Sequence, residues 1–275
     1  MNTLPQGKIL VPVDFSPRST DAVEYAMPIA KRFGSELIIL HVMEPLSIDF
    51  AMVEPSRALL QDFTSDRERA LKRQLGALGA KNPLGVPVRR LLLEGDPAVQ
   101  IVACSQSENV SLIIMPTQGR SRVRQFLIGS VTAKVLHDAD APVLTGVHLE
   151  QIKDFPVFGV RNLLCAVDLG RQSEAVMKMT RDLAQEYGAN TMLLHVAEPG
   201  SGVEKTIEEL LRSTGLTASV QIENGEPSKV VSEAAARLQA DLVIIGRGSS
   251  NTMIGRLRAQ AYAIVRQSPC PVLSV

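Results

Sequence analysis

The chain has 275 residues, of which 45% are hydrophobic and only 4% aromatic. Basic and acidic residues both total 29, so there is no net charge to attract nucleic acid or an anionic membrane, and we expect neither as a partner. The opening residues, "MNTLPQGK", contain no apolar signal region, and no apolar run approaches the roughly 20 residues that span a bilayer. These features predict a cytoplasmic protein.

The first half of the chain alternates short apolar runs with segments of helical periodicity. Ser16 followed by Pro17 predicts a helix start, Gly34 predicts the end of that helix, and Asp96 with Pro97 predicts the start of a later one. The expected strands are 8–13, 36–42, 86–95, 110–116 and 141–147, and the expected helices are 17–33, 56–78, 96–108 and 129–138.

The chain then repeats this order. "KILVPVDFS" at 8–16 returns as "NLLCAVDLG" at 162–170, and "ELIILHVMEP" at 36–45 returns as "NTMLLHVAEP", both shifted by 154 positions. Farther on, "EGDPAVQ" returns as "NGEPSKV" with a shift of only 130, so the first copy carries 24 additional residues (154 − 130). A repeat of this length indicates a duplicated domain.

We therefore predict an α/β protein of two doubly wound domains, each a five-stranded parallel sheet with helices on both faces. The segment 148–160 breaks the pattern with a Pro, a Gly and mixed polarity, which is typical of a linker. The predicted domains are therefore 1–149 and 158–275.

Ligands of such sheets bind beyond the carboxyl ends of the strands, where the strand order reverses. Asp14, Val42 and the segment after Met115 stand at those ends. Gly129 and Ser130 then open a helix, and the free backbone N–H groups of a helix start suit a phosphate.

The stretch "MPTQGRSRVRQFLIGSVTAKV" resembles the nucleotide-binding branch of the universal stress protein family. That branch is marked by Gly, two residues, Gly, nine residues, then Gly followed by Ser or Thr. Gly119, Gly129 and Ser130 match the last three elements, whereas Pro116 stands where the family has its first Gly. "VPVDFS", "LHV" and "APVL" extend the resemblance, and the chain is identified as a tandem member of the family.

The resemblance implies that an adenine nucleotide, ATP with or without Mg²⁺, binds in the N-terminal domain. Pro12, Val13 and Val42 would line the adenine slot, and Asp14 would meet the ribose or adenine side. The glycines and the start of the helix would hold the phosphates and ribose. The implied ligand-binding residues are Pro12, Val13, Asp14, Val42, Met115, Gln118, Gly119, Gly129, Ser130, Val131 and Thr132.

The second copy departs from this pattern. Asp168 and Val196 keep the strand-end positions and Gly246 restores the first glycine, but Arg258 and Ala259 replace the Gly and Ser of the helix start. We expect a degenerate second site and a mainly structural role for that half.

The last strand of each copy is apolar and would lie at a sheet edge, where an exposed edge invites pairing. In the family the fifth strands commonly join two domains. We therefore expect 141–147 and 270–275 to pair within the chain as a pseudo-dimer, and a further homodimer is an open alternative.

Other signals favour structural roles. His41 and His195 have no second His or acidic cluster at ligand spacing, so we predict no metal site and no catalytic residue. The three cysteines, Cys104, Cys165 and Cys270, lie in apolar sequence without CxxC spacing, which favours buried, reduced thiols.

Three functional hypotheses follow. The first is an ATP-binding sensor or regulator of the stress response. The second is an interaction protein with two inactive sites that works through its dimer surfaces. The third is a slow ATP hydrolase that uses Asp14, although no Walker A loop is present because the Gly7-Lys8 pair is followed by Ile9. The additional segment around 46–63 could cover the site or form another contact surface.

Overall fold

The computed structural model describes residues 4–45, 57–117, 128–146, 159–198, 200–247 and 256–275. Within them, the N-terminal half contains β1 (Lys8–Pro12), α1 (Pro17–Phe33), β2 (Glu36–Met43), α2 (Arg57–Ala77), β3 (Val88–Glu94), α3 (Pro97–Ser107), β4 (Leu112–Pro116), α4 (Ser130–Asp138) and β5 (Val143–Gly146). The C-terminal half contains β6 (Asn162–Val167), α5 (Ser173–Tyr187), β7 (Asn190–Val196), α6 (Glu204–Thr214), β8 (Ser219–Glu223), α7 (Pro227–Leu238), β9 (Leu242–Ile245), α8 (Arg256–Gln267) and β10 (Val272–Ser274).

The helix boundaries arise from local chemistry that the sequence displays. The Ser16 hydroxyl accepts a hydrogen bond from the Ser19 N–H at 3.3 Å and caps α1. Gly34 ends α1 at φ 62°, a left-handed conformation that favours glycine. At α3, the Asp96 carboxylate accepts from the Val99 N–H at 2.9 Å. These caps confirm the predicted starts of both helices.

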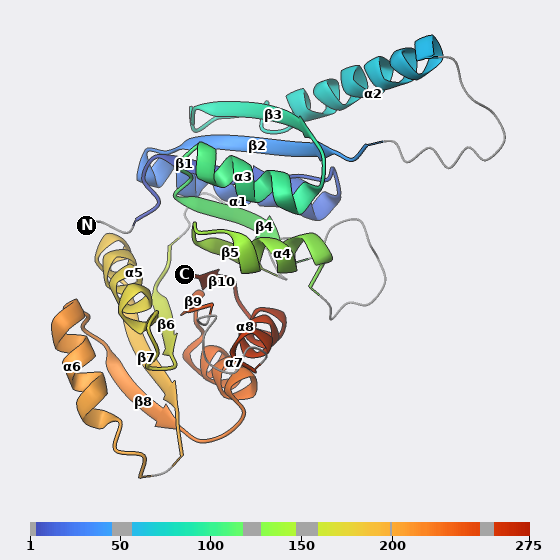
Figure 1. Ribbon diagram of the computed structural model, residues 1–275. Coiled ribbons are helices and arrows are strands. Elements are labelled where there is room, and N and C mark those ends of the chain that lie inside the picture. Colours follow the sequence, from blue (N-terminus) through green and yellow to red (C-terminus); the bar gives the residue numbers. More distant parts are fainter. Residues whose placement is uncertain (1–3, 46–56, 118–127, 147–158, 199, 248–255) are drawn as a thin grey trace.

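The strands form one ten-stranded sheet in the order β3-β2-β1-β4-β5-β10-β9-β6-β7-β8. Within each half all neighbouring strands are parallel, and the order reverses between β1 and β4 and again between β6 and β9. Figure 1 shows the two halves meeting at β5 and β10. The predicted fold class, two doubly wound five-stranded units, is confirmed. The exact limits at 149 and 158 remain a prediction, because residues 147–158 lie outside the described residues.

The two halves join through β5 and β10, which pair antiparallel. Leu144 lies opposite Leu273, and these two residues are themselves equivalent in the repeat. A local two-fold axis therefore passes close to this pair. The predicted pairing of the fifth strands within one chain is confirmed.

The core is continuous on one face of the sheet and divided on the other. On the face covered by α1 and α5, a single cluster of buried side chains runs through both halves, from Ile9 and Val23 to Met177 and Leu193. On the opposite face, α3 and α4 cover one cluster and α7 and α8 cover another. The halves therefore share apolar burial on the α1 and α5 side.

Equivalent residues of the two halves meet across the axis on that same side. The Arg32 guanidinium donates to the Glu186 carboxylate at 3.0 Å and lies 4.2 Å from the centre of the Tyr187 ring. Phe33 packs edge-on against Tyr187 at 6.1 Å between ring centres. Arg32 and Glu186 are 154 positions apart, the repeat shift. Divergence has therefore placed opposite charges where an exact repeat would oppose like charges.

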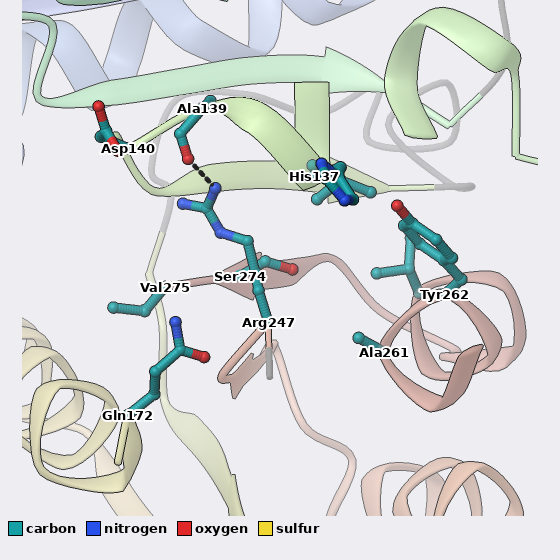
Figure 2. A pocket seen from close by; sticks show the side chains of 11 residues that line it. His137, Ala139, Asp140, Gln172, Arg247, Ala261, Tyr262, Ser274 and Val275 are labelled. Atoms are coloured by element: carbon teal, nitrogen blue, oxygen red, sulfur yellow. Dashed lines mark hydrogen bonds between the residues drawn. The ribbon is translucent and has the colours of Figure 1, made fainter. Parts of the chain in front are cut away.

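The other side of the junction is similarly unequal. The Tyr262 hydroxyl donates to the Ala133 carbonyl of α4 at 2.9 Å, and these two residues are also repeat equivalents. Arg247, just after β9, donates from its guanidinium to the carbonyl of Ala139 (Figure 2) and, at 2.6 Å, to that of Ala141. Burial lowers the Arg247 pKa to about 10, so the side chain stays charged at neutral pH. Its charge faces the carbonyl end of α4, which stabilises a cation.

A double-mutant cycle tests the charge pairing across the axis. Arg32→Glu sets two carboxylates against each other and removes the cation from Tyr187, so we expect the free energy of unfolding to fall by about 1–2 kcal/mol. Adding Glu186→Arg should restore about 0.5 kcal/mol, a modest figure because both side chains are about one-third exposed.

The control is Arg69→Glu, which breaks an exposed pair with Asp66 inside α2 and should cost less than about 0.5 kcal/mol. Chemical denaturation measures all four variants. Strictly additive single effects would contradict a direct Arg32 to Glu186 interaction.

Candidate functional site

A cavity of about 460 Å³ opens at the carboxyl ends of β1, β2 and β4, where the strand order of the N-terminal half reverses. This is the place at which doubly wound sheets bind ligands. Its described lining residues are Pro12, Val13, Asp14, Ser19, Leu40, His41, Val42, Glu44, Arg67, Leu71, Pro97, Ile101, Met115, Pro116, Gly129, Ser130, Val131 and Thr132.

Most of the residues predicted from the sequence come together here. Pro12, Val13, Asp14, Val42, Met115, Gly129, Ser130, Val131 and Thr132 all line the cavity. Gln118 and Gly119 lie outside the described residues.

One end of the cavity wall is the start of α4. Gly129 is the N-cap residue and has no side chain to accept from the first turn, while the Ala133 N–H begins the helical bonds by donating to the Gly129 carbonyl at 2.9 Å. The N–H groups of Ser130, Val131 and Thr132 precede that bond and have no partner within the helix. This end is therefore suited to an anionic group.

Two hydrogen bonds fix α4 against β4. The Gly129 N–H donates to the Thr117 carbonyl at 2.8 Å, and the buried Thr132 hydroxyl donates to the Pro116 carbonyl at 3.1 Å. Pro116 ends β4 and stands where the family has Gly. Its carbonyl anchors the helix, so the missing N–H of proline leaves this anchoring intact.

Another part of the wall is apolar. Val13 and Met115 are 5% exposed and Val42 is 8% exposed, and each ends or follows a parallel strand. A flat aromatic group buried against these side chains would lose little hydrogen bonding and gain apolar contact. The cavity thus combines apolar side chains at the strand ends with a helix start that is suited to an anion.

Asp14 lines the cavity and also stabilises the start of α1. Its carboxylate accepts from the Ser16 N–H at 3.0 Å and from the Ser16 hydroxyl at 2.6 Å, which braces the start of α1. Phe15 between them has φ 61°, a strained conformation for a non-glycine residue. The C-terminal half repeats this turn, with Asp168 accepting from the Gly170 N–H at 2.8 Å and Leu169 at φ 58°.

The two repeated histidines are tied to the chain in the same way. Nδ1 of His41 lies 2.7 Å from the Val13 carbonyl, and Nδ1 of His195 lies 2.8 Å from the Val167 carbonyl. A carbonyl only accepts, so each Nδ1 carries the hydrogen. These contacts support the structural interpretation of both histidines. Among the described residues, no group of three or more His, Cys, Asp and Glu side chains is arranged to hold a metal ion.

The corresponding cavity of the C-terminal half is smaller, about 220 Å³, and is lined by Asp168, Val196 and Gly246 among others. The repeat equates Ala259 with Ser130, yet α8 begins at Arg256, three residues before Ala259. The backbone groups equivalent to the start of α4 therefore lie inside a helix, where N–H groups bond to preceding carbonyls. The second half therefore differs in two ways: Arg258 stands at the position of Gly129, and the helix begins earlier.

Sequence reasoning did not anticipate Glu44, Arg67 and Leu71 in the wall of the larger cavity. Arg67 and Leu71 belong to α2 and lie four residues apart, on one face of the helix. The only signal was the 24-residue excess of the first copy, which locates the additional chain without showing which side chains reach the cavity.

Cys104 and Cys165 are buried as expected, whereas Cys270 is partly exposed. Burial raises the pKa of Cys165 to about 12 and that of Cys270 to about 11, so both remain protonated at neutral pH. Cys104 is buried as well, and its pKa is raised for the same reason. Across the described residues, we find no helix with the length and apolarity required to traverse a bilayer.

Comparison with known proteins agrees with the geometry. A model of the universal stress protein family matches residues 6–145 and 201–275. The chain is 30% identical over 150 residues to a universal stress protein of Methanocaldococcus jannaschii, covering 50% of this chain and 92% of that protein. It is 33% identical over 138 residues to one of Thermus aquaticus, covering 50% and 95%.

A solved structure resembles the whole chain. A universal stress protein from Archaeoglobus fulgidus matches with a TM-score of 0.74 and 25% identity, over 97% of both chains. The two-half architecture therefore also occurs in that protein. Since the family model spans most of the sequence and the full-length fold agrees, this chain belongs to the universal stress protein family.

Proposed function

We propose that the protein binds ATP in its N-terminal half and acts as a cytoplasmic sensor or regulator of the stress response. The observation that carries this proposal is the 460 Å³ cavity, which joins an apolar wall at the strand ends to the open start of α4. A nucleotide has the same division, with an aromatic base at one end and anionic phosphates at the other.

The proposed pose follows from that match. The base lies against Pro12, Val13, Val42 and Met115, and the ribose approaches Asp14. The phosphates accept hydrogen bonds from the N–H groups of Ser130, Val131 and Thr132. The resemblance assigns Gln118 and Gly119 to the same end. Mg²⁺, where present, is held by phosphate oxygens and water, its usual surroundings in nucleotide sites.

The C-terminal half is proposed to stabilise the first rather than to bind nucleotide. Its cavity has less than half the volume, and its helix start is displaced. Through the β5 to β10 pairing it also covers an edge that would otherwise be open. A homodimer of the whole chain remains a separate proposal.

Stoichiometry and one substitution test the site. The stripped protein should bind about one ATP per chain in calorimetry. Gly129→Arg, which copies the residue of the second half, should abolish binding because a long side chain then occupies the close approach to the phosphates.

The matched control is Gly76→Arg, an exposed position on α2 where an added Cβ meets no atom within 4 Å. It should bind ATP as the wild type does. Two equivalents per chain would show an active second site, and none would favour the interaction-only hypothesis.

Substitution of Asp14 separates binding from hydrolysis. Asp14→Ala should reduce ATP affinity about tenfold, because a charged hydrogen bond to the ribose is lost. It should also lower the free energy of unfolding by about 1 kcal/mol, because the brace at Ser16 is lost. Asp14→Asn keeps an acceptor oxygen for the Ser16 N–H, so it should restore stability more fully than affinity.

Calorimetry measures affinity, chemical denaturation measures stability, and phosphate release at saturating ATP measures turnover. Phosphate release should stay at a slow background in all three proteins. Substantial turnover in the wild type that disappears in Asp14→Ala would favour the hydrolase hypothesis instead.

A further inference from the structure

The larger cavity has a wall that its counterpart lacks. Arg67 and Leu71 of α2, together with Glu44 just after β2, line the N-terminal cavity. Among the described residues that line the C-terminal cavity, none comes from α6, the helix at the corresponding place in the chain. In Figure 1 the start of α2 extends past the carboxyl end of β2. The first copy has therefore gained a component of the site.

Arg67 stands at the β2 end of the cavity, whereas the start of α4 adjoins β4. Its Nη1 donates to the Glu44 carbonyl at 3.0 Å, which places the guanidinium beside the end of β2. The start of α4 is instead bonded to Pro116 and Thr117 at the end of β4. β1 lies between β2 and β4 in the sheet, so the end of β2 beside Arg67 and the strand end beside the start of α4 are separated by a full strand.

The guanidinium has capacity left for a ligand. An arginine side chain carries five N–H donors, and the Glu44 carbonyl takes one of them. Among the described residues, no carboxylate forms an ion pair with Arg67. The side chain is only partly exposed, and Leu71 one turn along the helix extends the apolar surface beside it.

We infer that Arg67 is a base-recognition residue: its guanidinium contacts the purine base of the bound nucleotide, and α2 forms the outer wall of the base site. The inference rests on the proposed ATP site. A planar guanidinium stacks on aromatic faces and donates to ring nitrogens, whereas Val13, Val42 and Met115 provide side chains that do neither. The phosphates already have their donors at the far end, in the first turn of α4.

The test is Arg67→Met in the full-length chain, because methionine keeps much of the unbranched apolar stem and removes the guanidinium. The matched control is Arg73→Met, an exposed position on the same helix outside the cavity wall. Three ligands are measured by displacement of radiolabelled ATP: ATP itself, adenosine and inorganic tripolyphosphate. Thermal unfolding confirms that all the proteins are folded.

We expect Arg67→Met to lower the affinity for ATP and the affinity for adenosine by a similar factor, about 5- to 20-fold. This factor corresponds to the loss of one base-stacking contact. Tripolyphosphate should bind as it does to the wild type, and Arg73→Met should change none of the three. Equal affinity of Arg67→Met and wild type for adenosine would overturn the inference. So would a loss confined to ATP and tripolyphosphate, because Arg67 would then contact phosphate.

The same experiment separates this inference from the proposed function. If the wild type binds no ATP, the proposed function fails and the role of Arg67 fails with it. If the wild type binds ATP and Arg67→Met binds it equally well, the ATP site stands and only the base-recognition role is wrong.

Discussion

The antiparallel pairing of β5 with β10 is the constraint on which the rest of the structure depends. Among the described residues three of each strand take part, and this pairing merges two parallel sheets into one. Contacts on both faces of the sheet support this short strand pairing. On the α1 and α5 side it is the shared core, and on the other side Arg247 and Tyr262 contact the chain around α4. Because the start of α4 also lines the N-terminal cavity, the junction and the candidate site share an element.

Covalent duplication explains why equivalent positions differ. A symmetric dimer of one domain would place each residue near the axis against its own copy, so a charge or a bulky ring would meet itself. In a tandem chain the two copies change independently. Arg32 can then face Glu186, and the Tyr262 hydroxyl can donate to the carbonyl of the small Ala133. The same freedom accounts for the unequal cavities, since α2 reaches one of them and α8 starts early beside the other.

The sequence predicted the parts of this molecule that depend on local pattern. A few neighbouring residues specify each of these parts: the strand ends, the caps at Ser16 and Asp96, and the glycine before α4. Placing Asp14, Val42 and Gly129 in one cavity required only the rule that parallel strands end at one edge. Arg67 was not predictable in this way, because helical periodicity in α2 leaves the packing direction of the helix undetermined. The early start of α8 could not be predicted either. The alignment of the two copies shows that Arg258 replaces the glycine, but it does not show that the helix begins earlier.

Two titratable groups of the cavity wall, Asp14 and His41, are held in place by the chain around them. The Asp14 carboxylate is engaged by two donors of Ser16, and moving it would disturb the start of α1 and the strained Phe15. His41 is fixed through Nδ1 to the end of β1, and its ring packs 4.4 Å from that of Phe15. Both groups are thus part of the frame that shapes the cavity. A ligand that enters the cavity therefore meets N–H donors and apolar walls that these contacts hold in place.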